Sequence, residues 1–169
     1  RGQADDVLLD TYESERSPHV HAFIELAVQL GAIIQTTDAQ AARERDARFR
    51  GGQPEIFHYP SPCLGPGVWV GDGTREGGPV GQVFPQPELA DGRLLDAAIG
   101  PRFAWIGDPD LLATADADTR ARWAAHGVVT LATSGAGLHD WLDHHGVRAV
   151  LLRPDRYVAG VARTPANLR

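Results

Sequence analysis

The part of the sequence that decides the fold is residues 103–162, FAWIGDPDLLATADADTRARWAAHGVVTLATSGAGLHDWLDHHGVRAVLLRPDRYVAGVA. Short apolar or β-branched runs predict strands over 103–106, 128–132, 147–152 and 157–162. Amphipathic stretches closed by Gly127 and Gly146 predict helices over 118–126 and 137–145. The tetrapeptide Arg153-Pro154-Asp155-Arg156 predicts a turn between the last two strands. The predicted order is therefore strand, helix, strand, helix, strand, strand.

This order predicts an α/β domain with thioredoxin-like topology over residues 80–169. Helices between the early strands favour parallel pairing there, whereas a turn of four residues can join only an antiparallel pair. A last helix is expected near Pro165, cut short by the end of the sequence.

A helical arm is predicted over residues 1–50. From Asp5 to about Gln35, apolar residues recur at helical spacing and form one stripe that needs a partner surface. Pro18 either kinks this helix or begins a second one after Ser17, and both alternatives remain open. Thr37 and Asp38 are candidate N-caps for a short polar helix that runs through Phe49. The residues of the stripe are Val20, Phe23, Ile24, Ala27, Leu30 and Ile34.

Residues 51–79 are rich in glycine and proline and predict a connector without regular structure. We expect a connector of this length to lie across a neighbouring surface or to be partly mobile. The segment Gly65-Pro-Gly-Val-Trp-Val-Gly71-Asp-Gly73 superficially matches a phosphate-binding glycine loop. The match fails because the third glycine falls one place late and no helix follows.

Thiol–disulfide chemistry is not expected. Cys63 is the single cysteine, and it lies in the connector without a CxxC partner. After the first predicted strand, where a thioredoxin keeps its redox pair, the chain reads Gly107-Asp108-Pro109-Asp110. Gly146-Val147-Arg148 stands where working thioredoxins have a proline.

Two further groups of chemically active side chains have simpler explanations. Ser134 lies between a strand and a helix beside glycines, but GxSxG is absent and a helix cap is its natural role. The pairs His139/Asp143 and Asp140/His144 share helix faces as metal ligands do, yet two ligands per face do not make a site. The amphipathic pattern instead buries Leu138, Trp141 and Leu142 and leaves the other side chains in solvent.

Composition excludes several classes of function. The net charge of -6 and the pI near 5.6 argue against a nucleic-acid partner, since phosphate binding needs a clustered positive surface. Neither a membrane span nor a secretory signal is present in the sequence, so we expect a cytoplasmic protein without a membrane partner. Met is absent, which leads us to expect a piece of a longer protein.

Three segments together resemble the FAD-dependent aromatic hydroxylases of the phenol hydroxylase and 3-(3-hydroxyphenyl)propionate hydroxylase type. Residues 8–19, LLDTYESERSPH, resemble the stretch that follows the last cofactor motif of the flavin domain. The segments FPQP at 84–87 and DGRLLD at 91–96 resemble the entry to the C-terminal domain. Residues 153–159, RPDRYVA, resemble its closing hairpin. The resemblance covers nearly the whole chain.

The resemblance implies a thioredoxin-like, redox-inactive domain preceded by a helical arm from the end of a flavin-binding domain. The longer protein would use FAD, NAD(P)H and O₂ to hydroxylate a phenolic or other aromatic ring, with the difficult chemistry supplied by the cofactor. The family's flavin motifs lie upstream and none occurs here, so no catalytic, cofactor-binding or metal-binding residue is assigned to this chain.

Two kinds of function remain open at this stage. The chain is either the C-terminal part of a flavin hydroxylase, with the upstream flavin-binding domain as its partner, or a stand-alone redox-inactive thioredoxin-like binding module. If the flavin-binding domain is missing, the apolar stripe of the arm should fold back on its own domain or pair with a second copy. A homodimer is the expectation.

Overall fold

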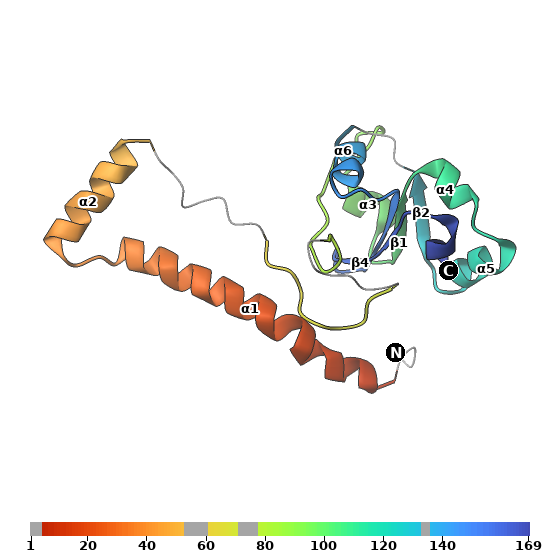
Figure 1. Ribbon diagram of the computed structural model, residues 1–169, viewed down its shortest axis with the longest axis horizontal. Helices are drawn as coiled ribbons and strands as arrows, with labels where there is room; N and C mark the ends of the chain where they lie inside the picture. Colours follow the sequence, from red (N-terminus) through yellow and green to blue (C-terminus); the bar gives the residue numbers. More distant parts are fainter. Residues whose placement is uncertain (1–4, 53–60, 71–77, 133–135) are drawn as a thin grey trace. The chain divides into compact units, whose positions relative to one another are not determined.

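The structure is a computed structural model, and it describes residues 5–52, 61–70, 78–132 and 136–169 (Figure 1). The chain forms two compact units, Arg1–Gly67 and Val68–Arg169, and each is described by itself. The boundary between them falls inside the predicted connector. Its residues 53–60 and 71–77 lie outside the described part.

The first unit contains the helices α1 (Val7–Ile34) and α2 (Ala39–Arg50). Pro18 lies inside α1, so the alternative in which a second helix starts after Ser17 is wrong. Asp38 is the N-cap of α2, as predicted, and its carboxylate accepts a hydrogen bond of 2.7 Å from the Ala41 N–H. Arg45 of α2 ties the two helices together by donating to the Ile33 carbonyl over 3.0 Å.

In the described residues, no single helix is both long and apolar enough to cross a bilayer. Length and composition alone would allow it only for α1 and α2 taken together, across the bend of 105° between them.

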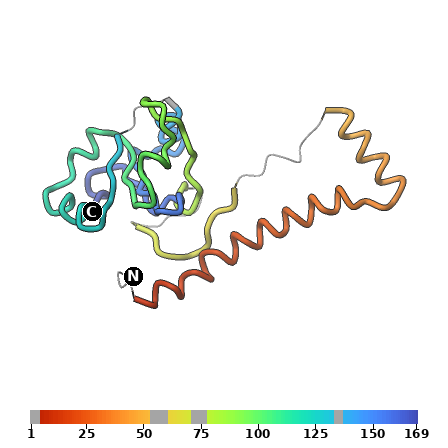
Figure 2. Tube along the Cα trace, turned by 180° about the vertical axis from the view of Figure 1, so that it is seen from behind, coloured from red at the N-terminus to blue at the C-terminus, as the bar shows by residue number. Residues whose placement is uncertain are grey.

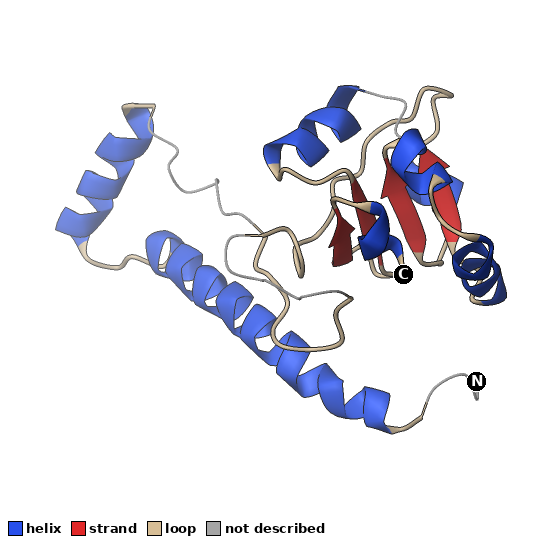
Figure 3. Ribbon diagram, turned by 45° about the vertical axis from the view of Figure 1, so that its right-hand side comes forward, coloured by secondary structure: helices blue, strands red, loops and turns tan. Residues whose placement is uncertain are grey.

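The second unit is built on a four-stranded sheet with the order β2-β1-β3-β4 (Figure 3). The strands are β1 (Ala104–Gly107), β2 (Val129–Ala132), β3 (Ala149–Leu152) and β4 (Val158–Ala162). The first two pair in parallel, as predicted, and β3 is antiparallel to both β1 and β4. All four predicted strands are therefore confirmed, with bounds within two residues of the prediction.

Short helices connect and cover these strands. The predicted helices are present as α5 (Ala117–Ala125) and α6 (Ala136–His144), and the 3-10 helix η2 (Pro165–Leu168) lies where the last helix was expected. Two further helices, α3 (Leu95–Ile99) and α4 (Pro109–Ala113), were not predicted from the sequence. The start of α4 could nevertheless have been predicted from the sequence, because Asp108 is an N-cap and Pro109 suits the first helical position.

The sheet separates two apolar clusters, because successive side chains of a strand point to opposite faces. Ile106 lies on the face shared with α3 and α6, and Trp105 lies on the face shared with α4 and η2. The strand β3 is buried along its whole length, which identifies it as central to the core. The first cluster includes Leu95, Ile99, Leu138, Leu142, Val150 and Leu152; the second includes Leu111, Leu112, Leu151 and Leu168.

Candidate functional site

The predicted apolar stripe of α1 lies largely on the surface of the first unit. Exposed fractions are 43% for Phe23, 52% for Ile24 and 78% for Ile34, and Leu30 is only half-buried. Apolar surface gains stability when it leaves water, by roughly 25 cal/mol per Å². Exposed apolar side chains that gather on one helix are typical of surfaces that contact another protein surface. Other exposed apolar side chains of α1 are Val7, Leu8, Leu9, Tyr12, Val20 and Val28.

A second face of α1 is covered by the segment 61–67, which runs alongside the middle of the helix (Figure 2). The Gly65 N–H donates to the Glu15 carbonyl over 2.6 Å. A Cβ at Gly65 would overlap the Ser14 carbonyl oxygen, and a Cβ at Gly67 would overlap the Glu15 side chain. These two glycines are therefore needed for contact with the helix.

The packing of the segment 61–67 on α1 also shows whether its glycines could bind a phosphate of the FAD that the resemblance implies. A dinucleotide-binding loop leaves its glycines open so that the backbone can approach a pyrophosphate. Here atoms of α1 occupy the space in front of Gly65 and Gly67, so these residues do not fit a flavin phosphate. Gly71 and Gly73 of the same candidate loop lie outside the described residues.

Two polar side chains of α1 are buried in the first unit, Glu15 and His19. Burial, with a smaller contribution from the Arg16 charge, lowers the pKa of His19, so the ring favours its neutral form. Its ring meets Phe23 edge to face at 5.0 Å. A groove of about 480 Å³ that includes Phe23 in its lining lies between α1 and the start of the segment 61–67. Its lining also includes Leu26, Gln29 and Pro62.

The predicted turn at 153–156 is confirmed and is fixed to the second unit from both ends. Arg156 has a left-handed backbone with φ 70°, and its N–H donates to the Arg153 carbonyl over 3.0 Å. The Arg156 guanidinium pairs with Asp96 and donates to the Gly100 carbonyl over 2.9 Å. Arg153 lies over the Trp69 ring at 5.5 Å. The turn therefore anchors α3 to the closing hairpin.

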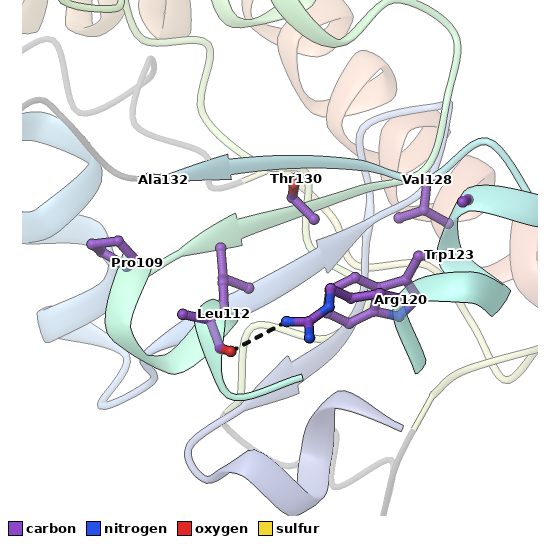
Figure 4. Close-up of a pocket in the computed structure, with 9 residues that line it drawn as sticks. Pro109, Leu112, Arg120, Trp123, Val128, Thr130 and Ala132 are labelled. Atoms are coloured by element: carbon purple, nitrogen blue, oxygen red, sulfur yellow. Dashed lines mark hydrogen bonds between the residues drawn. The ribbon is translucent and has the colours of Figure 1, made fainter. Parts of the chain in front are cut away.

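A groove of about 540 Å³ lies beside β2 on the face of the sheet covered by α4 and α5 (Figure 4). Trp123 stands at one end of it, Thr130 of β2 points into it, and Ala132 also lines it. Arg120 is the charged group of its lining and donates to the Ala113 carbonyl over 3.4 Å. Nothing in the sequence analysis identified this groove. No local sequence signal marks it, because it depends on how α4 and α5 pack beside β2.

The residue that directly follows β1, Asp108, forms an ion pair with Arg148. Asp108 caps α4 by accepting from the N–H groups of Asp110 and Leu111, at 2.8 and 3.3 Å. Its second carboxylate oxygen accepts from Arg148 over 2.6 Å. Hydrogen bonding to Arg148 is the main reason that the pKa of Asp108 lies below its usual value. Cys63 belongs to the first unit and is exposed.

The remaining candidate residues form no site in the described part of the chain. His139, Asp140, Asp143 and His144 of α6 are exposed, and no group of three or more metal-ligating side chains occurs among the described residues. The predicted apolar face of α6 is confirmed, since Leu138 and Leu142 are buried and Trp141 packs against the core. Ser134 lies outside the described residues.

Comparisons with known proteins identify relatives along the whole chain. Residues 126–168 match the model of the HcaD C-terminal domain. A 3-(3-hydroxy-phenyl)propionate/3-hydroxycinnamic acid hydroxylase of Burkholderia vietnamiensis is 34% identical, over 99% of this chain and 39% of the relative. One from Mycobacterium avium is 33% identical, over 94% of this chain and 34% of the relative. The chain thus spans between a third and two fifths of the length of these relatives.

Solved structures support the same relationship at the level of fold. The flavin-dependent monooxygenase PieE, solved in complex with FAD and substrate, matches 99% of this chain and 39% of its own, with a TM-score of 0.61 at 22% identity. The OxyS anhydrotetracycline hydroxylase from Streptomyces rimosus matches 98% of this chain and 34% of its own, with a TM-score of 0.57 at 24% identity. The chain is homologous to the C-terminal region of the flavin-dependent aromatic hydroxylases.

Proposed function

We propose that this chain works as the C-terminal region of a longer aromatic hydroxylase and that its role there is structural. In this proposal α1 packs against an upstream flavin-binding domain, and the second unit closes the substrate side or contributes to contacts between subunits. The observation that carries the proposal is the exposed apolar surface of α1 in a chain whose relatives extend well beyond it.

The proposal assigns the chemistry to the rest of the longer protein. FAD, reduced by NAD(P)H, would supply oxygen activation for hydroxylation of an aromatic ring. No described residue of this chain is given a catalytic role, because Gly65 and Gly67 fit α1 rather than a flavin phosphate. The names of the relatives support a phenolic acid as the substrate class. This chain would hold α1 in place so that the flavin-binding domain has a dry apolar surface to pack on.

We further propose that the second unit is a thioredoxin-like domain. The sheet order β2-β1-β3-β4, with β1 and β2 parallel and β3 antiparallel to its neighbours, supports this proposal. The elements α4 and α5 between β1 and β2, and α6 between β2 and β3, also support it. In such a domain the redox pair would directly follow β1. Asp108 lies there and forms an ion pair with Arg148, which favours a purely structural domain.

The experiment uses the product of the complete gene that contains this chain. We expect the purified protein to retain FAD and to oxidise NAD(P)H faster when a phenolic acid is added. The double variant Phe23→Asp, Ile24→Asp places charges in the apolar surface of α1, and it should lose FAD retention together with turnover. The matched control, Ser17→Asp with His21→Asp, adds charge at exposed polar positions of α1 and should retain both.

The outcomes separate this proposal from a stand-alone binding module. Equal FAD retention in the two double variants would contradict a role of α1 in packing against the flavin domain. A complete gene product without FAD would contradict the hydroxylase function itself and favour the binding module.

A further inference from the structure

The two outer edges of the sheet in the second unit differ in whether another segment of the chain forms hydrogen bonds to them. The outer edge of β4 is covered by the segment that precedes α3. Val70 N–H donates to the Ala159 carbonyl over 2.8 Å, Gly81 N–H donates to the Val158 carbonyl over 2.9 Å, and Val158 N–H donates to the Gln82 carbonyl over 2.9 Å. The Val158 N–H and carbonyl groups and the Ala159 carbonyl are therefore satisfied from within the chain.

The outer edge of β2 has no such cover in the part of the chain that the structure describes. Val129 N–H donates inward, to the Phe103 carbonyl over 2.9 Å, which agrees with the parallel register of β1 and β2. Backbone groups alternate in direction along a strand, so the N–H and C=O groups of Thr130 and Ala132 point outward. None of the described residues hydrogen-bonds to these outward groups.

The strand β2 has four residues, and shortness is itself a protection of a free edge, but β2 lacks the features that block pairing chemically. Proteins usually place a charge, a proline or a bulge on such strands. Residues 128–132 are Val-Val-Thr-Leu-Ala, without a charge or a proline, and β2 pairs with β1 in regular register. The side chains of Thr130 and Ala132 are small and lie in the open groove beside α4 and α5 (Figure 4). An added strand would therefore meet little steric hindrance from them.

We propose that β2 pairs with β2 of a second copy of this chain, antiparallel across a two-fold axis at Leu131. In this register Thr130 lies opposite Ala132 of the second copy, and Ala132 lies opposite its Thr130. Each such pair exchanges two backbone hydrogen bonds. The two four-stranded sheets thereby join into one continuous sheet.

The hydrogen-bonding pattern of β2 favours a second copy in this register. The outward groups of Thr130 and Ala132 satisfy each other fully when the axis passes through Leu131. A register centred on Thr130 would place Val128 opposite Ala132, yet the Val128 N–H already donates to the Trp123 carbonyl over 2.8 Å. Two uncharged identical strands also meet without repulsion between like charges. The contact is isologous, so it closes at the dimer.

The first test is sedimentation of the chain at micromolar concentrations. We expect a dimer for the wild type. Thr130→Pro removes the outward N–H but leaves the inward bonds of Val129 and Leu131, and it should weaken the dimer by about tenfold or more. The control Thr130→Val keeps the backbone donor and should remain dimeric. Phe23→Asp with Ile24→Asp changes α1 and should also remain dimeric.

The second test is disulfide crosslinking, carried out in a Cys63→Ser background so that the native thiol cannot react. In the proposed register Leu131→Cys faces its own copy at a non-hydrogen-bonded position, where Cα atoms are about 4.5 Å apart and a disulfide can form. Val129→Cys is the matched control, because two such residues would lie about 13 Å apart along the strands. We expect mild oxidation to give a crosslinked dimer with Leu131→Cys only.

Three results would overturn the proposal. They are a monomeric wild type, a dimer unaffected by Thr130→Pro in a variant whose circular dichroism shows that it is folded, and equal crosslinking of Leu131→Cys and Val129→Cys. A dimer lost only in the Phe23→Asp, Ile24→Asp variant would assign the contact to α1 and would equally contradict pairing through β2.

Discussion

Gly65 and Glu15 are joined by a backbone hydrogen bond of 2.6 Å, from the Gly65 N–H to the Glu15 carbonyl. The bond forms at the turn of α1 that Pro18 disturbs, since proline lacks a donor and its ring crowds the carbonyl four residues earlier. The carbonyl that Pro18 leaves without its helical donor is that of Ser14, so the segment 61–67 binds α1 at the neighbouring carbonyl, that of Glu15.

Gly65→Ala should detach the segment 61–67 from α1. The added Cβ would overlap the Ser14 carbonyl oxygen and press on the Pro18 ring, so backbone must move. Overpacking of this kind costs typically about 1–3 kcal/mol. Urea unfolding followed by far-UV circular dichroism measures the change.

Gly31→Ala is the matched control in the same helix. A Cβ there would meet nothing within 4 Å, so the substitution should stabilise α1 by about 1 kcal/mol through helix propensity. Equal effects of the two alanines would contradict the contact between the segment 61–67 and α1.

Asp108→Asn should remove the ion pair with Arg148 while keeping an N-cap on α4. Both side chains are partly exposed, so we expect a loss of only about 0.5–1 kcal/mol at neutral pH. The pKa of Asp108 lies below its ordinary 3.8 in the folded protein, mainly because of Arg148. The stabilisation is therefore complete above that ordinary value and is lost as the pH falls through the lower folded-state value.

The stability difference between wild type and Asp108→Asn, measured by urea unfolding across the acid range, tests this dependence. Asp110→Asn removes a charge from the same turn without touching Arg148 and serves as the control. The account fails if the difference for Asp108→Asn grows as the pH falls.

Two substitutions of Arg156 distinguish the contribution of its side-chain contacts to the stability of the turn at 153–156 from that of its left-handed backbone. Arg156→Ala removes the contacts with Asp96 and the Gly100 carbonyl but keeps a side chain at φ 70°. We expect it to cost about 2 kcal/mol. Arg156→Gly loses the same contacts but relieves the backbone, so it should be more stable than Arg156→Ala by about 1 kcal/mol. Thermal unfolding of both variants would show this order, and the reverse order would contradict it.

Thiol–disulfide exchange should be absent. Cys63 is exposed in the first unit, and it is the single cysteine of the sequence, so the chain cannot form an internal disulfide. Reduction of insulin by dithiothreitol should proceed at the same rate with and without the protein. Acceleration that disappears in Cys63→Ser would show that the chain has redox activity after all.

The sequence was sufficient to predict the strands, because β-branched runs closed by glycines or by the turn at 153–156 are local signals. It was also sufficient for α2, whose cap is Asp38. The continuity of α1 through Pro18 was not predicted, because a proline permits either a kinked helix or a helix break and the local sequence does not distinguish the two. Helix α3 has five residues and an N-cap, Leu94, without a side-chain hydrogen bond, so it left no local signal. The groove beside β2 depends on how α4 and α5 pack, which periodicity does not encode.

We predict that this chain packs beside a flavin-binding domain and does not bind FAD by itself. The most direct measurement is the amount of FAD that remains after gel filtration, compared between the chain of 169 residues and the product of its complete gene. We predict no retained FAD on the chain alone and equimolar FAD on the complete product. Equimolar FAD on the chain alone, or none on the complete product, would contradict the account.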